Sequence, residues 1–253
     1  MTELDGKAVL VTGAAAGVGE GIALACAAAG ASVVVTARRP EAGQAVVDEI
    51  VARGGQAHFV RCDVTSADDV GAAVEATVDT YGHLDALVHN ATSNRSSEPV
   101  DLEHAPLSLW EEHAAVAITA SYRLARAAYE HLRAGRGSLL ILTSPAGIDG
   151  SASLSFYGVA KAAQRGFLKA LAREWALDGI RVNGLAPLAR TPALDNAIVA
   201  DPTMLPRLER IVPLGWIGDS ERDIGPTAVF LCSEAARYVT GQTLIVSGGR
   251  FMM

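Results

Sequence analysis

The stretch KAVLVTGAAAGVG, residues 7–19, joins an apolar run to a turn that contains glycines and then to an alanine-rich segment. Residues 7–12 predict a buried strand, and residues 17–29 predict a helix. Glycines in such a turn let backbone N–H groups at the helix N-terminus approach a phosphate, which the helix dipole also favours. The turn therefore indicates a nucleotide site, although tight turns also need glycine for steric reasons alone.

Short runs rich in β-branched residues alternate with longer alanine-rich stretches along the rest of the chain. This alternation is typical of repeated βαβ units, in which helices cover a sheet of parallel strands. We expect further strands at 32–36, 57–61, 85–89, 138–143, 180–185 and 243–246, and further helices at 41–53, 67–80, 107–134, 155–177 and 222–233. No linker, repeat or low-complexity segment divides the chain, so the sequence predicts a single α/β domain over residues 1–253.

The composition argues against nucleic acid and membrane partners. Of 253 residues, 50% are hydrophobic and 19% are charged, which is enough apolar material for a large core. The net charge of -7, with scattered arginines, provides no basic field that would attract a phosphate backbone. The N-terminal segment lacks the basic region of a signal peptide, and no apolar run approaches the roughly 18 residues of a spanning helix. We therefore expect a soluble protein.

The three cysteines, Cys26, Cys62 and Cys232, lie far apart in the sequence. They form no C-x-x-C pair, and no histidine spacing suggests a zinc site. Reduced thiols fit a cytoplasmic protein. We predict a cytoplasmic location and no metal site.

The glycine spacing is T-G-x-x-x-G-x-G, beginning at Thr12. With this spacing the chain resembles the short-chain dehydrogenase/reductase family, and the resemblance covers nearly the whole sequence. It implies a Rossmann-like, doubly wound sheet of about seven parallel strands flanked by helices, in a homotetramer or homodimer. It also implies that the turn binds a nicotinamide nucleotide through Gly13, Ala15, Gly17, Val18 and Gly19.

The end of the second expected strand, Thr36-Ala37-Arg38-Arg39, bears on the choice between NADP(H) and NAD(H). In NAD-preferring relatives an aspartate aligns with Ala37, so the acid that would repel a 2′-phosphate is missing here, and Arg38 can pair with the phosphate. We therefore expect NADP(H) to be favoured, with Arg38 and Arg39 among its contacts. A solvated pair of loop arginines is the alternative, and Ala16 stands where many NADP-binding relatives have a second basic residue.

Three further segments resemble parts of the family that contact the cofactor. The resemblance assigns such contacts to Asp63, Val64, Asn90, Ala91, Pro187 and Thr191. It implies that Asp63 contacts the adenine, that Asn90 ties strand ends together beside the cofactor, and that Thr191 meets the carboxamide.

The segment Tyr157-Gly158-Val159-Ala160-Lys161 places a phenol and an ammonium on one face of a helix. A free phenol has a pKa of about 10 and is a poor base at neutral pH. A neighbouring ammonium and an oxidised nicotinamide favour the phenolate, so we expect a lowered pKa for Tyr157. Ser144 matches the family's serine, which holds the substrate oxygen, and a turn hydroxyl before Pro145 is the alternative that the joint spacing of the three residues disfavours. The resemblance also gives Lys161 a second task, binding the nicotinamide ribose.

Three positions near the nicotinamide end depart from the family pattern. Ala117 stands where many relatives have an asparagine that orders a water beside the lysine, Leu188 stands where a glycine usually follows Pro187, and Thr92 replaces another glycine. Cofactor binding is therefore a firmer expectation than turnover. We hypothesise that proton supply uses another route, so that Ala117→Asn leaves turnover unchanged or modestly altered.

The expected function is hydride transfer between NADP(H) and the carbonyl or alcohol of a small apolar substrate, with Ser144 orienting the oxygen and Tyr157 acting as acid or base. One alternative is an NADP(H)-binding sensor or scaffold with little or no turnover, and another is epimerisation or elimination at the same site. The irregular, proline-bearing region 192–210 could form a substrate lid or a plain surface excursion. Trp216 could widen an apolar interface or fill the core.

Overall fold

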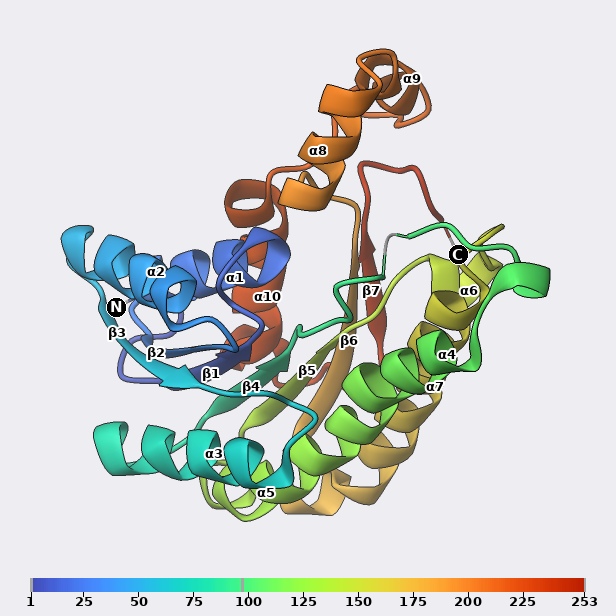
Figure 1. Cartoon of the computed structure of the whole chain (residues 1–253). Coiled ribbons are helices and arrows are strands. Elements are labelled where there is room, and N and C mark those ends of the chain that lie inside the picture. The colour runs from blue at the N-terminus through green and yellow to red at the C-terminus, as the bar shows by residue number, and fades with distance from the viewer. Residues whose placement is uncertain (1, 97, 253) are drawn as a thin grey trace.

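The computed structural model describes residues 2–96 and 98–252, and within them seven parallel strands form one sheet (Figure 1). The strands are β1 (Ala8–Thr12), β2 (Ser32–Ala37), β3 (Gln56–Arg61), β4 (Ala86–His89), β5 (Ser138–Leu142), β6 (Arg181–Pro187) and β7 (Thr243–Val246). Their order is β3-β2-β1-β4-β5-β6-β7. The direction of winding reverses between β1 and β4, which is where sheets of this kind bind ligands, beyond the carboxyl ends of the strands. The prediction of a doubly wound sheet of about seven strands is confirmed.

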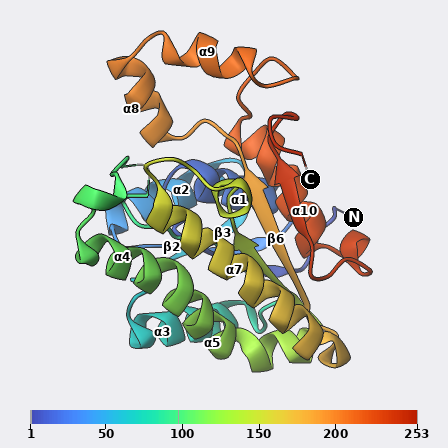
Figure 2. The ribbon, with the colours of Figure 1, turned by 90° about the vertical axis from the view of Figure 1, so that its right-hand side faces the viewer.

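Helices cover both faces of this sheet (Figures 1 and 2). On one face lie α1 (Gly17–Ala28), α2 (Pro40–Ala52) and α10 (Gly225–Cys232), and on the other lie α3 (Ala67–Tyr81), α5 (Ala120–Gly135) and α7 (Ser155–Glu174). Alternate residues of β1 serve the two cores: Val9 and Val11 pack toward α1, whereas Leu10 packs toward α5. A parallel strand buried on both faces needs such an unbroken apolar run.

The expected helix at 107–134 is not one regular helix. It consists of α4 (Leu107–His113), a π-helical segment (Ala114–Thr119) and α5. A π-helical turn inserts an extra residue and changes the direction of nearby carbonyl groups. Ala117, where the family asparagine is missing, lies in this widened segment and is buried.

The expectation that region 192–210 is irregular is wrong. It forms α8 (Pro192–Ala200) and α9 (Met204–Arg210), and these two helices project from the body of the molecule beyond the strand ends (Figures 1 and 2). The Thr191 hydroxyl accepts a hydrogen bond from the Leu194 N–H at 3.3 Å, and Pro192 occupies the first turn of α8. These are favourable positions for a helix start. Neither helix contains a buried residue.

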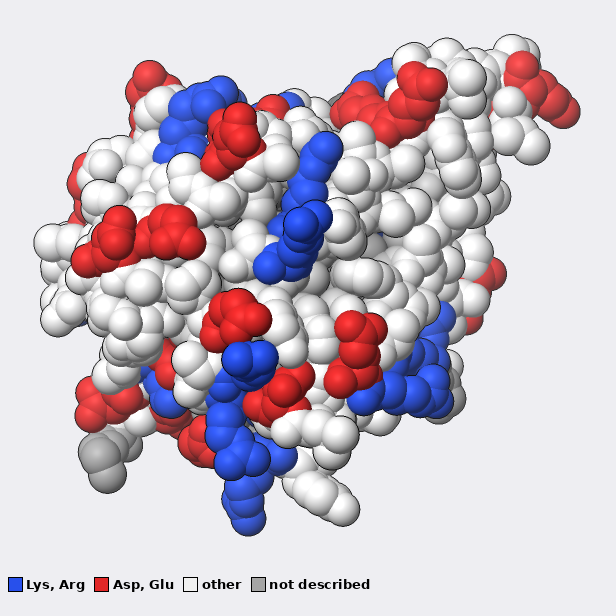
Figure 3. Space-filling view, turned by 90° about the horizontal axis from the view of Figure 1, so that it is seen from below, with Lys and Arg blue, Asp and Glu red and all other residues white. Residues whose placement is uncertain are grey.

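Several surface features complete the fold. Lys and Arg side chains are interspersed with Asp and Glu on the face shown in Figure 3. Trp216 is half exposed, so it does not fill the core. None of the helices within residues 2–96 and 98–252 has the length and apolar character needed to cross a membrane. A short helix, α6 (Ala146–Asp149), leads from β5 toward α7.

Candidate active site

The ends of β1 and β4 are joined by hydrogen bonds at the point where the winding reverses. The Thr12 hydroxyl oxygen lies 3.1 Å from the Asn90 backbone nitrogen and 3.2 Å from that of Ala91. The Asn90 side-chain amide donates to the backbone oxygens of Thr12 and Gly13 at 3.1 and 2.9 Å. Asn90 therefore ties the two strand ends together.

The glycine turn after β1 forms a tight cradle at the start of α1. Gly13 and Gly17 have positive φ angles of 64° and 61°, a backbone region that favours glycine. A Cβ at Gly19 would lie 2.3 Å from the Asn90 amide nitrogen, so no larger residue fits. Ala16 precedes the helix without a side-chain cap. The helix N-terminus favours a phosphate group, and the residues of the turn fit a dinucleotide.

The ends of β2 and β3 place the residues expected at the adenosine side. Asp63 accepts hydrogen bonds from the Thr65 backbone and hydroxyl at 2.9 and 2.7 Å. Burial raises the pKa of Asp63, but these hydrogen bonds and the charge of Arg38 outweigh it, so the pKa lies below its usual value. Arg38 and Arg39 are exposed, and within residues 2–96 and 98–252 neither guanidinium has a hydrogen-bond or ion-pair partner. Val64 is buried beside Asp63.

Three predicted catalytic residues come together beyond β5. Ser144 follows the strand, while Tyr157 and Lys161 occupy successive turns of α7, with the Lys161 ammonium 5.7 Å from the centre of the Tyr157 ring. The Lys161 side chain is only 3% exposed, and its Nζ donates to the Leu142 carbonyl at 2.7 Å and to the Gln164 Oε1 at 3.0 Å. The structure therefore brings Tyr157 and Lys161 together, as their spacing in the sequence predicts.

The remaining predicted contacts lie along β6 and at the start of the α8 helix. A Cβ at Gly17 would be 3.5 Å from the side chains of both Thr191 and Pro192, so this segment lies against the glycine turn. The Leu188 N–H donates to the Val246 carbonyl at 2.8 Å and continues the pairing of β6 with β7. Among the described non-glycine residues, only Arg136 and Ser153 have positive φ. Glycine is therefore not required at Leu188 or Thr92.

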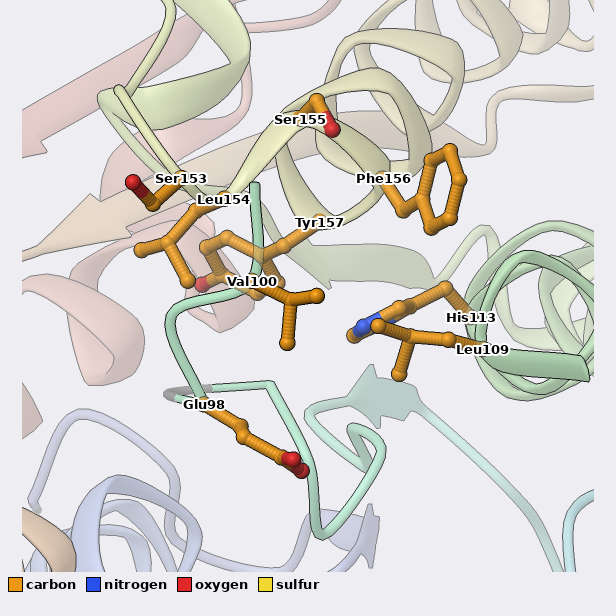
Figure 4. Close-up of a pocket in the computed structure, with 9 residues that line it drawn as sticks. All are labelled: Glu98, Val100, Leu109, His113, Ser153, Leu154, Ser155, Phe156 and Tyr157. Atoms are coloured by element: carbon orange, nitrogen blue, oxygen red, sulfur yellow. The ribbon is translucent and has the colours of Figure 1, made fainter. Parts of the chain in front are cut away.

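A narrow cleft adjoins Tyr157 between α4 and α7 (Figure 4). Its walls mix apolar and polar side chains, from Glu98, Val100, Leu109, His113, Ser153, Leu154, Ser155, Phe156 and Tyr157. The His113 ring lies edge-on to the Tyr157 ring, with 6.2 Å between their centres. Glu98 and Val100 come from the loop at 93–104, in which Ser97 lies outside the described residues.

Comparisons with known proteins agree with this arrangement. A family model described as enoyl-(acyl carrier protein) reductase matches residues 13–250. The chain belongs to the short-chain dehydrogenase/reductase family. A 7alpha-hydroxysteroid dehydrogenase from Escherichia coli is 37% identical over 97% of this chain and 94% of its own length. A 3-oxoacyl-[acyl-carrier-protein] reductase from Synechocystis is 34% identical over all of both chains.

Solved structures of short-chain dehydrogenases/reductases superpose on nearly the whole chain. A 7 alpha-hydroxysteroid dehydrogenase complexed with NADH and 7-oxo glycochenodeoxycholic acid has a TM-score of 0.90 and 35% identity, covering 98% of this chain and 95% of its own. A short-chain type dehydrogenase/reductase from Mycobacterium marinum has a TM-score of 0.86 and 32% identity, covering 99% and 97%. Family membership makes the chain an oxidoreductase of CH–OH and C=O groups, and the hydroxysteroid dehydrogenase relative is complexed with NADH.

The expected lowering of the Tyr157 pKa does not occur in this short-chain dehydrogenase/reductase on its own. Burial raises the pKa of the Tyr157 phenol, and the nearby Ser144 hydroxyl opposes this effect without overcoming it. Burial also lowers the pKa of Lys161 to about 8. The spacing of Tyr157 and Lys161 predicted that they are neighbours but could not give the depth at which both lie.

Sequence reasoning missed three buried side chains near the reacting residues of this short-chain dehydrogenase/reductase. They are His89, His113 and Gln164. Burial and then the Lys161 charge lower the pKa of His89 to about 3, and burial lowers the pKa of His113, so both rings are neutral at pH 7. Gln164 lies three residues after Lys161, a spacing that places two side chains on one helix face and could have indicated the contact.

The described cysteines are buried, and their thiols hold their protons at neutral pH. All three cysteines are free and buried, and burial raises the pKa of Cys62 to about 12 and that of Cys232 to about 11. Within the part of the chain that the structure describes, no three His, Cys, Asp or Glu side chains gather closely enough to hold a metal ion.

Proposed function

We propose that this short-chain dehydrogenase/reductase uses NADP(H) and transfers a hydride to or from the carbonyl or alcohol carbon of a small, largely apolar molecule. The convergence of Ser144, Tyr157 and Lys161 carries this proposal. The apolar residues of the neighbouring cleft, such as Leu109 and Phe156, support an apolar substrate. The hydroxysteroid named for one relative is such a molecule.

The cofactor would lie across the carboxyl ends of the strands. The residues proposed to hold it are Gly13, Ala15, Gly17, Val18, Gly19, Arg38, Arg39, Asp63, Val64, Asn90, Ala91, Tyr157, Lys161, Pro187 and Thr191. The free guanidinium of Arg38 after β2 supports NADP(H), because it can form charge-assisted hydrogen bonds to a 2′-phosphate. One solved relative binds NADH, so the preference requires a direct measurement.

A bound nicotinamide nucleotide would supply the hydride chemistry of the proposed reaction, and Lys161 would hold its ribose. The Ser144 hydroxyl holds the substrate oxygen, and the Tyr157 phenol passes the proton to or from it. Because burial raises the pKa of Tyr157, the phenol is protonated at neutral pH, which suits donation to a carbonyl. Removing that proton for alcohol oxidation is favoured by higher pH and by the charges of Lys161 and the oxidised nicotinamide.

The test is NADPH oxidation over a panel of ketones and quinones that includes 7-oxo glycochenodeoxycholic acid. We expect turnover with part of the panel and a loss of about 100- to 10,000-fold in Tyr157→Phe, with a much smaller loss of NADPH affinity because the variant keeps the aromatic ring. Tyr238→Phe is the control, because Tyr238 is almost fully exposed. Tight NADPH binding without turnover of any compound would support a sensor or scaffold instead.

Three subsidiary proposals accompany this function. The α8–α9 arm would act as the substrate lid, because it begins at Thr191 and Pro192 against the glycine turn and contains no buried residue. The chain would assemble as a homotetramer or homodimer, which light scattering can determine. The reduced, buried cysteines are compatible with a cytoplasmic location.

A further inference from the structure

A buried chain of hydrogen bonds connects Lys161 on α7 to the π-helical segment Ala114–Thr119 and to the start of α5. Gln164 is 1% exposed; its Oε1 accepts from Lys161 Nζ at 3.0 Å, and its Nε2 lies 3.1 Å from Ser121 Oγ and 3.3 Å from the Ala117 carbonyl oxygen. An ammonium can only donate and a carbonyl can only accept, so these partners fix the orientation of the amide. Both ends of the Gln164 side chain are therefore engaged.

The π-helical segment Ala114–Thr119 supplies the anchor for this amide. The Ala117 carbonyl also accepts from the Ser121 hydroxyl at 2.6 Å, so one backbone oxygen receives two side-chain donors. The Ala120 N–H also donates to this carbonyl, so the widened turn gathers one backbone donor and two side-chain donors on the Ala117 oxygen. The alanine side chain at 117 contributes no polar atom, so the link to Lys161 is made by Gln164.

Lys161 depends on this link because it is buried without a counter-ion. Its Nζ donates to the Leu142 carbonyl and to Gln164, and no carboxylate of the described residues pairs with it. The titratable groups that face it are Tyr157 on its own helix, His89 from β4 and His113 from α4. None of these three bears a negative charge at pH 7. Gln164 is thus the one side-chain acceptor for this ammonium within residues 2–96 and 98–252.

We propose that Gln164 is a positioning residue, which holds Lys161 beside Tyr157 and keeps it charged by linking it to the carbonyl of Ala117 and the hydroxyl of Ser121. This inference rests on the proposed function for its catalytic meaning. The hydrogen bonds themselves can be tested without any substrate.

The first test measures the pKa of Lys161 directly in the protein without cofactor. The chain has three lysines, Lys7, Lys161 and Lys169, so lysine labelled with ¹³C at the ε carbon gives three NMR signals. Replacing Lys7 and Lys169 with arginine assigns them. We expect Gln164→Leu to lower the pKa of Lys161 by about one unit, since a hydrogen bond to a charged group is lost.

Two further variants separate this effect from a packing defect. Gln164→Glu should raise the pKa of Lys161, because a carboxylate then faces the ammonium, whereas damaged packing would not move the pKa in opposite directions. Ser121→Ala should give a smaller shift in the same direction as Gln164→Leu, and it keeps the test open if that variant does not fold. Gln44→Leu, at an exposed position of α2, is the control and should leave the pKa of Lys161 unchanged. An unchanged pKa of Lys161 in Gln164→Glu and Ser121→Ala overturns the proposal.

The second test is the pH dependence of alcohol oxidation with NADP⁺. In Gln164→Leu, Lys161 loses its charge at lower pH and supports the Tyr157 phenolate less. The acid limb of kcat should therefore move up by about one pH unit with KM unchanged, and Gln164→Glu should not show this shift. A lower kcat at every pH without a shift would show a structural role only. Absence of turnover in the unmodified protein would overturn the proposed function, while the NMR titration would still decide the role of Gln164.

Discussion

The glycine cradle and the buried network around Lys161 serve different parts of the proposed cofactor site and are built differently. The cradle is made of backbone: Gly13, Gly17 and Gly19 bring the chain close to Asn90, whose amide binds two backbone oxygens. The network is made mainly of side chains, with Gln164 joining Lys161 to the Ser121 hydroxyl and to one backbone oxygen, that of Ala117. Backbone geometry tolerates little change at single positions, whereas a side-chain network can be rebuilt with different residues.

The cradle should be broken by a single methyl group. A Cβ at Gly19 would lie 2.3 Å from the Asn90 amide nitrogen and 2.4 Å from the Gly13 carbonyl, so Gly19→Ala must displace the turn. We expect NADPH affinity to fall by about 100-fold or more and the free energy of unfolding to fall by about 1–3 kcal/mol. Fluorescence titration with NADPH and urea unfolding measure these two changes.

Gly71→Ala is the matched control for this prediction. Gly71 lies within the helix α3, where an added Cβ would have no neighbour within 4 Å. It should stabilise the protein by about 0.5–1 kcal/mol and leave NADPH affinity unchanged. Equal effects of the two substitutions on affinity would mean that the cradle is not the nucleotide site.

Arg38, at the proposed adenosine side of the site, allows the two nucleotides to be compared. Arg38→Gln removes the free cation after β2, and we expect NADPH affinity to fall by about 10- to 100-fold, as for loss of charge-assisted hydrogen bonds. NADH affinity should change little, because NADH has no 2′-phosphate. Isothermal titration with both nucleotides checks this, with exposed Arg237→Gln as the control. Equal losses for both nucleotides would contradict an NADP(H) preference based on Arg38.

The fold and the backbone part of the site could be predicted from local spacing. The glycine turn, and the four-residue interval between Tyr157 and Lys161, specify geometry within one turn of chain. Region 192–210 was misjudged because its prolines suggested loops, although Pro192 and Pro206 both fall in the first turns of helices, where proline is tolerated.

The buried network could not be predicted in this way, because its partners come from segments far apart in the sequence. Ser121 and Gln164 are separated by 43 residues, and their contact depends on how α5 packs against α7. The raised pKa of Tyr157 likewise follows from burial, which spacing does not reveal.

His89, at the end of β4, tests how strongly burial changes the pKa of a side chain near Lys161. Its pKa falls from 6.5 to about 3 on folding, first through burial and then through the Lys161 charge. Below pH 6.5 the unfolded chain therefore binds a proton that the folded chain does not, and this lowers stability as the pH falls toward 3. When the pH falls from 7 to 5, the free energy of unfolding decreases in the unmodified chain because of His89. We expect this decrease to be about 2 kcal/mol smaller in His89→Asn.

Urea unfolding at pH 7, 6 and 5 measures this difference. His58→Asn, at an exposed position of β3, provides the control. Its free energy of unfolding should depend on pH as in the unmodified chain. A His89→Asn variant with the same pH dependence as the unmodified chain would show that the folded His89 ring takes up a proton after all.

The smallest effect on turnover is expected where the family asparagine is missing. Ala117 is 4% exposed, and its carbonyl already serves Gln164 and Ser121. Ala117→Asn adds a buried amide that the existing network does not need, so we expect about 1–3 kcal/mol lower stability and a change in turnover of less than about threefold. Ala128→Asn, equally buried in α5 but outside the network, controls for the stability loss. A gain in turnover of several orders of magnitude would instead mean that Gln164 does not supply the connection, and that the side-chain end of the site is defective rather than rebuilt.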